Sequence, residues 1–358
     1  MKYYTVEVQE LDYLKKTAGL KARDDIEKIL SSEKYKEIQI PLNCANREQQ
    51  KIIGKIKTHW LVKKSLEKKL EELKSGDVLV LQIPIIEHSV FLYMAFRQLK
   101  KRGVKIIGLV HDMEYIRISH RKDVSTQMRF RLKFEEKTLE YCDKIIVHNS
   151  RMKQYLTKVG FDEDKLIPLE IFDYLIDDFN EMRLQRRKNE LGDPIIIAGN
   201  LMRQKSEYVY KLPDSVRFNL YGVLYDGVEK ENICYKGAFS PEEIPYIMDG
   251  SYGLVWDGDS AYTCSGVYGE YLRINNPHKT SLYLASGIPV IIWENAALAS
   301  FIKKHKSGIV VDSLYSIPDV LKGISKDEYA EMKKNALGIS EKLRQGYYTM
   351  RAINKALN

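Results

Sequence analysis

The sequence predicts an α/β protein with two Rossmann-like domains, each a parallel sheet flanked by helices. Three observations lead to this fold class. The chain has 358 residues, more than one hydrophobic core normally serves. Short runs of Val, Ile and Leu alternate with longer helical patterns, as expected for parallel strands buried on both faces. This alternation stops at a charged segment near the middle of the chain and then begins again.

The first domain is predicted over residues 1–175. Its strands are expected at residues 3–8, 37–42, 77–84, 104–112 and 143–149, and its helices at about 19–30, 46–73, 88–103 and 124–141. Gly103 ends one of these helices, and cations fill the last turn, where the helix dipole favours them. Another helix follows the last strand, and Asn149 or Ser150 is expected to cap it.

Residues 176–193 are predicted to be the linker, because they are highly charged and end at Gly-Asp before Pro194. The second domain is predicted over residues 194–335. Its strands are expected at residues 194–200, 216–222, 233–239, 252–258, 288–293 and 307–313. The chain is helical from about Lys326, and residues 336–358 are expected to form a C-terminal helix that packs back on the first domain.

Composition and charge exclude several functions. The chain is 44% hydrophobic and 30% charged and has no run of about 18 apolar residues, so no membrane-spanning helix is expected. Its N-terminus lacks the apolar core of a signal peptide, and its four dispersed cysteines show no paired metal spacing. We therefore expect a cytoplasmic protein with free thiols. The net charge of +8 suits an anionic small molecule or an anionic membrane surface, and no motif supports nucleic-acid binding.

The segment INNPHKTSLYLASGIPVII, residues 274–292, places polar residues at the start of an otherwise apolar helix. Pro277 suits the first turn, and Gly287 ends the helix. Lys279 lies in the first turn, where the dipole makes a cation unfavourable for the helix itself. An anion such as a diphosphate, held between Lys279 and the free N–H groups, would account for it. A lysine that only reaches solvent is the alternative.

A second candidate anion site follows the strand at 194–200, where Arg203 and Lys205 come soon after Gly199 and Asn200. Gly199 would let the backbone approach a ligand closely, and the Arg203 guanidinium can bind two phosphate oxygens. Ligands of open parallel sheets lie outside the carboxyl ends of the strands. This site and Lys279 are therefore expected to share one anion, with plain surface solvation as the alternative.

The segment VWDGDS places Asp257 and Asp259 directly after a strand. Paired carboxylates there resemble the Asp-X-Asp metal motif of metal-dependent sugar transferases and could hold Mg²⁺ or Mn²⁺ with a diphosphate. A tight turn, in which Asp caps and Gly258 supplies a positive φ, is the favoured interpretation, together with a sugar contact. We therefore predict no metal.

His111 and Asp112 close the fourth strand of the first domain. Asp112 could act as a general base, or could orient His111 for that role, although such a pair is often only a loop cap. In the loop at 9–25, Thr17 and Gly19 could close over a ligand. That loop lacks G-x-G-x-x-G, so a nicotinamide or flavin dinucleotide is not expected. The helix at 128–141 mixes basic and aromatic residues, with a solvated face expected and membrane docking as the alternative.

Residues 252–302 resemble the C-terminal domain of bacterial galactofuranosyltransferases that build O-antigen and capsular polysaccharide. The resemblance also covers TAGLKARDD, LVHDME, HNSRMKQYL, EIFDYL and AGNLMRQKSEYVY in the same order, and so spans most of the chain. The wider family includes glucosyltransferases that extend glycans on streptococcal adhesins. The resemblance implies a GT-B fold, in which two Rossmann-like domains face one cleft and the second binds the nucleotide sugar.

The resemblance also implies a site. Arg203, Tyr221 and Lys279 match residues that hold the UDP group in the adhesin enzymes, and Tyr221 is expected beside the uracil. Asp112 is expected to be the base, and Lys279 and Arg203 are expected to stabilise the leaving group. The full UDP-sugar site is predicted to comprise Gly199, Asn200, Arg203, Tyr221, Asp257, Asp259, Asn275, Asn276, His278, Lys279 and Thr280.

The resemblance favours an inverting transfer of galactofuranose from UDP-galactofuranose to a glycan acceptor. Three alternative functions remain open. A UDP-glucose-dependent glucosyltransferase is the first, a nucleotide-sugar epimerase the second, and a non-catalytic glycan-binding or partner subunit the third. A DNA-modifying transferase fits poorly with the small basic excess. A lipid-linked acceptor at the inner membrane face and a homo-oligomer are compatible with this function.

Overall fold

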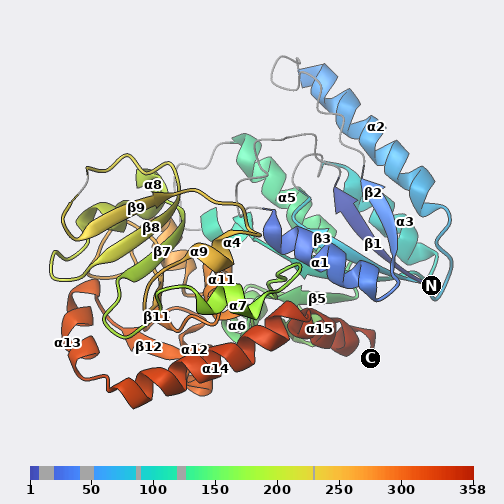
Figure 1. The fold of residues 1–358 in the computed structure, drawn as a ribbon. Helices are drawn as coiled ribbons and strands as arrows, with labels where there is room; N and C mark the ends of the chain where they lie inside the picture. Colours follow the sequence, from blue (N-terminus) through green and yellow to red (C-terminus); the bar gives the residue numbers. More distant parts are fainter. Residues whose placement is uncertain (8–19, 41–51, 86–89, 119–125, 229) are drawn as a thin grey trace.

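The computed structural model describes residues 1–7, 20–40, 52–85, 90–118, 126–228 and 230–358. It contains two six-stranded sheets, in which every pairing between the strands is parallel, and helices flank both sheets (Figure 1). The fold class predicted from the sequence is confirmed.

The first sheet has the strand order β2-β1-β3-β4-β5-β6. Its strands are β1 (Lys2–Glu7), β2 (Lys36–Ile40), β3 (Val78–Ile83), β4 (Lys105–Val110), β5 (Lys144–Val147) and β6 (Leu166–Pro168). The sequence predicted five of these strands and missed β6. This strand has only three residues and pairs only with β5, and an edge strand tolerates a proline such as Pro168.

The helices of the first domain are α1 (Lys21–Ser32), α2 (Ile52–Leu70), α3 (Leu92–Lys101), α4 (Glu114–Ile118), α5 (Thr126–Glu140) and α6 (Ser150–Lys158). Asn149 caps α6 by accepting a hydrogen bond from the backbone N–H of Met152 at 3.0 Å, one of the two caps expected. The short α4, which follows β4 closely, was not predicted. It matters because it positions Arg117 beside the end of β4.

The second sheet has the order β12-β11-β10-β7-β8-β9, and all six strands were predicted. They are β7 (Ile195–Asn200), β8 (Phe218–Val223), β9 (Ile233–Gly237), β10 (Gly253–Val255), β11 (Val290–Trp293) and β12 (Gly308–Val311). The helices are α7 (Glu181–Gln185) in the predicted linker, then α8 (Arg203–Ser206), α9 (Ile244–Ile247), α10 (Gly266–Tyr271), α11 (His278–Ala285), α12 (Ala299–His305) and α13 (Ile317–Lys322).

The C-terminal part forms two helices, α14 (Lys326–Arg344) and α15 (Tyr347–Leu357). The predicted division at residue 336 falls inside α14, and the chain turns instead at Gly346, which has a φ of 70°. There α15 contacts β5 and β6 of the first sheet (Figure 1). The Asp173 carboxylate holds the start of α15 by accepting hydrogen bonds from the backbone N–H groups of Tyr348 (3.1 Å) and Thr349 (2.6 Å).

Within the described residues, no helix is both long and apolar enough to cross a membrane.

Candidate active site at the domain interface

Lys279 lies in the first turn of α11 and faces the end of β10. Its Nζ donates hydrogen bonds to the Trp256 carbonyl (2.9 Å) and to Oδ1 of Asp257 (2.8 Å). The side chains of Lys279 and Asp257 are only 15% and 10% exposed, so the pair is screened weakly by solvent. The structure therefore brings together two predicted site residues, and a carboxylate of the chain compensates the cation at this helix start.

Asp259 has different partners from Asp257. Its carboxylate accepts a hydrogen bond from the Ser265 hydroxyl, and its carbonyl accepts one from Lys211 Nζ at 2.8 Å. The chain turns between the two aspartates at Gly258, which has a φ of 106°. The two carboxylates thus have separate hydrogen-bond partners. In the described part of the chain, His, Cys, Asp and Glu side chains form no group of three or more that could hold a metal ion.

The end of β7 carries Gly199, whose φ of 137° is unfavourable for any residue with a Cβ. A Cβ built there would meet no atom within 4 Å, so the backbone is open on that side. The Asn200 side chain accepts a hydrogen bond from the Met202 N–H at 2.9 Å and thereby shapes the turn into α8. Gly199 thus has the open backbone that the sequence argument required, while the side-chain amide oxygen of Asn200 stabilises the turn.

Arg203 and Lys205 diverge from each other in α8. Arg203 stacks on the Tyr210 ring at 3.8 Å and pairs with Asp226 at 3.3 Å, with its side chain 54% exposed. Burial lowers the pKa of Lys205, and the charges of Asp257, Lys279, Asp112 and Arg117 act on it as well. Lys205, rather than Arg203, therefore shares the electrostatic environment of Lys279.

Tyr221 lies within the second domain and not at its surface. Its side chain is 2% exposed, and its hydroxyl accepts from the Asp249 N–H (2.9 Å) and donates to the Ile247 carbonyl (3.2 Å). Burial raises the pKa of Tyr221 to about 12. Its ring lies 6.2 Å from that of Phe239. In this conformation the ring offers no free face for a uracil, because neighbouring side chains and backbone enclose it.

Asp112 follows β4 and is bonded across the domain interface. Its Oδ1 accepts hydrogen bonds from the Tyr271 hydroxyl (2.6 Å) and the Met113 N–H (3.1 Å), and its Oδ2 lies 3.3 Å from Arg117. Tyr271 belongs to α10 of the second domain, and burial together with the Asp112 charge raises its pKa well above the usual value. The sequence argument missed Tyr271, because no local pattern shows a contact between residues so far apart in the chain, and it missed Arg117 because the short α4 was not predicted.

His111, beside Asp112, is held in one tautomer. Gln82 donates its amide N–H groups to Glu27 (3.0 Å) and to the Thr5 carbonyl (3.5 Å). The Gln82 oxygen must then accept from His111 Nε2, which lies 2.6 Å away. This leaves Nδ1 as an acceptor, and within the described residues it has no hydrogen-bond partner. Burial lowers the pKa of His111 well below its usual value, so the ring is neutral near pH 7.

The asparagines before α11 differ in role. The side-chain N–H groups of Asn276 donate to the carbonyls of His148 (2.6 Å) and Glu170 (3.1 Å), and its side-chain oxygen accepts from Asn149 at 2.7 Å. Asn276 is only 4% exposed and joins the two domains, so its amide is already used by the protein. Buried polar atoms of Asn275 (Oδ1) and Thr280 (Oγ1), by contrast, have no partner among the described residues.

His278 also contacts the first domain. Its ring stacks on Tyr174 at 5.2 Å, and its Nε2 lies 3.4 Å from the Asp173 carbonyl. Burial lowers the pKa of His278 to about 4. Both predicted substrate residues, Asn276 and His278, thus contribute contacts between the domains. Thr17 and Gly19 lie outside the described residues.

Because the ring of His148 is buried and accepts a hydrogen bond, we expect the stability of the protein to depend on pH. Its Nδ1 accepts the Asn276 N–H at 2.9 Å, which requires a neutral ring, and burial lowers its pKa to about 4. Between about pH 6.5 and 4 this ring binds more protons in the unfolded chain than in the folded one, so its contribution to stability falls as the pH falls through this range. For a group shifted this far the loss is about 3 kcal/mol.

Chemical denaturation of the wild type and of His148→Gln at pH 7 and pH 4.5 would measure this loss, as the change that the substitution makes in the difference between the two pH values. His148→Gln, which can still accept the Asn276 N–H, should reduce the difference between the two pH values. His305→Gln, on α12 and outside this interface, should reduce the difference less than His148→Gln does, because burial also lowers the pKa of this half-buried ring, by a smaller shift. Equal pH dependence in the wild type and His148→Gln would contradict the assignment.

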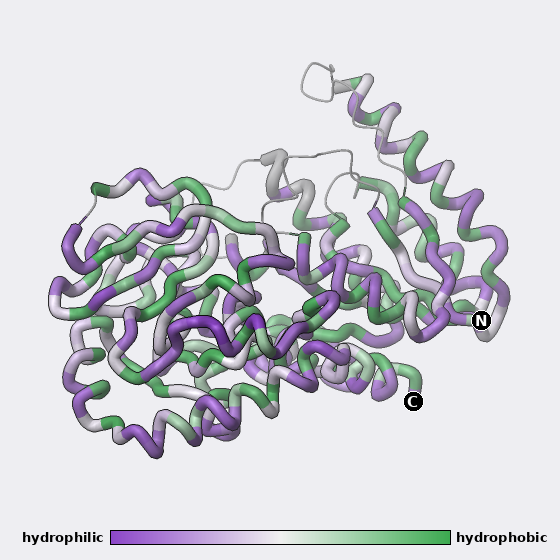
Figure 2. Tube along the Cα trace, viewed as in Figure 1, coloured by the Kyte–Doolittle hydropathy of each residue, from purple (hydrophilic) through white to green (hydrophobic). Residues whose placement is uncertain are grey.

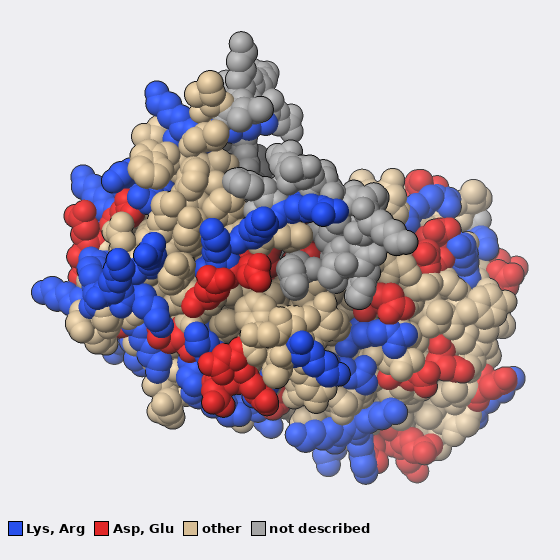
Figure 3. Space-filling view, turned by 180° about the vertical axis from the view of Figure 1, so that it is seen from behind, with Lys and Arg blue, Asp and Glu red and all other residues tan. Residues whose placement is uncertain are grey.

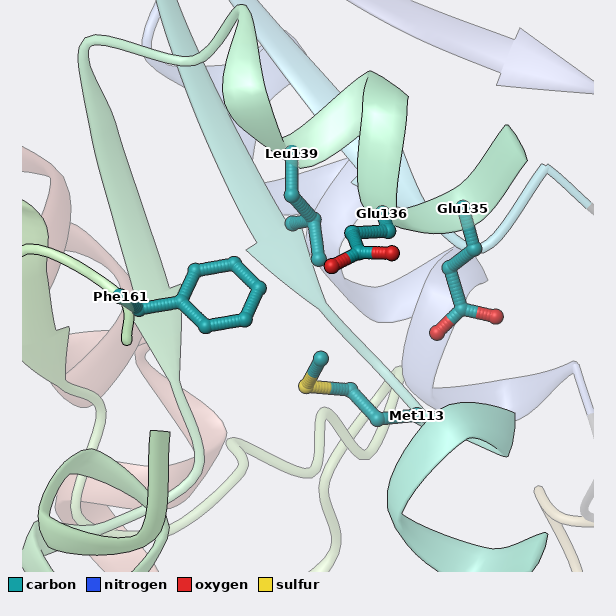
Figure 4. A pocket seen from close by; sticks show the side chains of 5 residues that line it. All are labelled: Met113, Glu135, Glu136, Leu139 and Phe161. Carbon is teal, nitrogen blue, oxygen red and sulfur yellow. The ribbon is translucent and has the colours of Figure 1, made fainter. Parts of the chain in front are cut away.

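A small pocket lies beside this site. Met113, Glu135, Glu136, Leu139 and Phe161 line it, and Figure 4 shows the Met113 and Phe161 side chains pointing toward one another across it. Its lining includes none of the predicted site residues. The predicted site residues therefore lie outside this pocket.

Comparison with known proteins shows which family the chain belongs to. The family "Glucosyltransferase 3-like, N-terminal domain" matches residues 6–171, and "Glucosyltransferase 3-like, C-terminal domain" matches residues 195–356. Beta-1,6-galactofuranosyltransferase WbbI of Escherichia coli (strain K12) is 34% identical over 355 residues, which are 98% of each chain. Glucosyltransferase 3 of Streptococcus gordonii is 24% identical over 292 residues, 79% of each chain.

Solved structures share the fold. Sucrose-phosphate synthase from Thermosynechococcus elongatus superimposes with a TM-score of 0.61 at 13% identity, covering 99% of this chain and 97% of that one. WaaG, a glycosyltransferase involved in lipopolysaccharide biosynthesis, superimposes with a TM-score of 0.57 at 12% identity, covering 99% of both chains. The chain therefore belongs to the Glucosyltransferase 3-like family of glycosyltransferases and has the GT-B fold.

Proposed function

We propose that this chain is an inverting β-1,6-galactofuranosyltransferase that uses UDP-galactofuranose in the synthesis of a surface polysaccharide such as O-antigen or capsule. The observation that carries this proposal is the 34% identity to the galactofuranosyltransferase of Escherichia coli over 98% of both chains. Residues for a displacement reaction are also available at the interface of the two domains.

The proposed reaction is a single displacement. An acceptor hydroxyl attacks the anomeric carbon, the bond from that carbon to the UDP oxygen breaks, and the hydroxyl proton passes to the base. Asp112 is the proposed base, and it lies within electrostatic range of Lys205, as does Lys279. A substrate hydroxyl would displace one of the three donors that now surround the Asp112 carboxylate. Positioning and charge stabilisation would supply most of the rate.

The leaving diphosphate is proposed to bind Lys279 and Arg203 at the carboxyl ends of β10 and β7. Lys279 would exchange its ion pair with Asp257 for the phosphate, and Asp257 would then be free to contact the sugar. Arg203 would leave Asp226, a partner that is itself 67% exposed and so bound weakly. We propose Lys205 as a third cation, because burial lowers its pKa and the charges of both Asp257 and Lys279 act on it.

The second candidate function is transfer of glucose from UDP-glucose. It is supported by the Glucosyltransferase 3 proteins of Streptococcus gordonii and Streptococcus parasanguinis, which are 24% and 25% identical over 292 residues. The lower identity and smaller coverage make this the weaker candidate.

Thermal unfolding in EDTA tests nucleotide recognition and the proposed independence from metal. The ligands are UDP, GDP, UDP-galactofuranose, UDP-galactopyranose, UDP-glucose and UDP-N-acetylglucosamine. A ligand at 100 times its dissociation constant adds about 2.7 kcal/mol to the free energy of unfolding. We expect stabilisation by UDP and a further increase with UDP-galactofuranose. Stabilisation only after Mn²⁺ is added would contradict metal independence, and no response to any nucleotide would favour a non-catalytic subunit.

A further inference from the structure

Helix α2 has one face packed on the first domain. Val62, Leu66 and Leu70, at helical spacing, are at most 2% exposed, and α2 contacts β2 and α3. These residues are sufficient to hold the C-terminal half of α2 on the domain. The N-terminal half projects away from the rest of the structure in Figure 1. Its apolar residues therefore need another explanation.

The projecting part of α2 exposes large hydrophobic side chains. Ile53, Ile56 and Trp60 are 82%, 51% and 43% exposed, and Leu61 is 49% exposed. The spacing of 53, 56 and 60 places these three residues next to one another along one side of the helix. Figure 2 shows hydrophobic and hydrophilic residues mixed along this helix. Single exposed apolar residues are ordinary, but four within nine residues form a patch.

The same helix is strongly basic. Its 19 residues contain Lys55, Lys57, Lys63, Lys64, Lys68 and Lys69, with Glu67 as the single acidic residue. Glu67 is engaged by Lys63 at 2.7 Å, so it does not offset the exposed lysines. Lys57, Lys64 and Lys68 are exposed and share the side of the helix that carries Trp60. Figure 3, which views the molecule from behind, shows Lys or Arg side chains (blue) beside uncharged ones (tan) on the projecting part of α2.

Trp60 sits where the patch meets the domain. Its ring contacts the Phe91 ring at 5.9 Å, and Lys63 Nζ lies 4.3 Å from its centroid. A tryptophan with an apolar body and neighbouring lysines is typical of side chains at the boundary between lipid and water. Trp60 is also the one tryptophan with substantial exposure, since Trp256 and Trp293 are at most 1% exposed.

We propose that α2 docks this protein on an anionic lipid bilayer, with Ile53, Ile56 and Trp60 entering the headgroup region and the lysines contacting lipid phosphates. The charge of α2 favours an anionic bilayer over a second copy of this chain or a nucleic acid. A symmetric contact between two copies would place two lysine-rich helices together, at a cost from like charges. Nucleic acid would satisfy the lysines but would leave the isoleucines in water. An anionic bilayer satisfies both groups.

Co-sedimentation of the full chain with vesicles tests the proposal. Phosphatidylcholine vesicles containing phosphatidylglycerol should bind the protein, and pure phosphatidylcholine should bind it weakly. Ile53→Ser/Ile56→Ser and Lys57→Glu/Lys64→Glu should each reduce partitioning, the latter by at least about 20-fold. Tryptophan emission should shift to shorter wavelength on binding, and Trp60→Phe should remove this shift while the protein still sediments.

Matched controls use residues of the same kind elsewhere. Leu224→Ser/Val228→Ser removes two exposed apolar residues, 60% and 82% exposed, from the second domain. Lys326→Glu/Lys334→Glu reverses two exposed charges on α14. Both controls should bind vesicles like the wild type. Equal sedimentation with and without anionic lipid would overturn the proposal. So would light scattering that shows an oligomer which the Ile53→Ser/Ile56→Ser change dissociates, with no vesicle binding.

Discussion

Lys279→Met is expected to lower turnover about 10²–10³-fold, the usual cost of removing one group that stabilises developing negative charge. In the proposed reaction this charge develops on the leaving diphosphate, and Lys279 is the cation at the start of α11 that faces it. Steady-state kinetics with saturating donor would measure the loss. The loss should appear in kcat as well as in kcat/KM, because the interaction strengthens as the bond breaks.

The same substitution leaves Asp257 without its ion-pair partner, so stability should also fall, by about 1–3 kcal/mol. The double change Lys279→Met/Asp257→Asn separates the two effects. It should restore much of the stability and none of the turnover. Recovery of turnover in the double variant would show that Lys279 only balances Asp257. Lys211→Met is the control. It removes an exposed lysine whose Nζ donates a hydrogen bond to the Asp259 backbone carbonyl, and it should change turnover little.

Asp112→Asn is expected to lower turnover about 10²–10⁴-fold, the range for loss of a general base. The asparagine keeps an oxygen for Tyr271 and Met113 but cannot take up a proton, so the domain contact should survive. Donor binding, measured by the UDP-induced shift in unfolding temperature, should change little. Glu114→Gln is the matched control, because Glu114 also pairs with Arg117 but lies on α4 and is not a proposed base. It should have a small effect.

His111→Gln decides between the two candidate bases. The free Nδ1 of His111 is an acceptor that points away from its Gln82 contact, so His111 could also receive the proton. Near-normal turnover in Asp112→Asn together with a large loss in His111→Gln would move the base to His111. The pH profiles of kcat/KM of the wild type and of both variants would add support. The variant that lacks the essential base should lose the fall in kcat/KM at acidic pH.

The strands could be predicted from the sequence because buried parallel strands are continuous apolar runs. The exception is β6, whose three residues carry too little pattern. The C-terminal division was placed near residue 336, whereas the chain turns at Gly346, a residue that also suits a helix end. Positions directly after strands, such as Asp112 and Asp257, were predictable for the same reason as the strands themselves.

Contacts between the domains could not be predicted. Tyr271 and Asp112 are 159 residues apart and meet only in the folded protein. Asn276 was predicted to bind substrate, and its position before α11 gave no sign that its amide would bond to His148 and Glu170. Similarly, Tyr221 lies in the apolar strand β8, and the sequence alone does not show that its hydroxyl bonds to the backbone around Asp249.

The most direct measurement is transfer itself. The chain is incubated in EDTA with UDP-galactofuranose and an alkyl pyranoside acceptor, in parallel with the 6-deoxy form of the same acceptor, and the product is analysed by mass spectrometry and NMR. The proposed function predicts UDP release and one β-linked galactofuranose on the 6-hydroxyl, with no product from the 6-deoxy acceptor. Transfer from UDP-glucose alone, an α-linked product, or conversion of the UDP-sugar without any acceptor would contradict it.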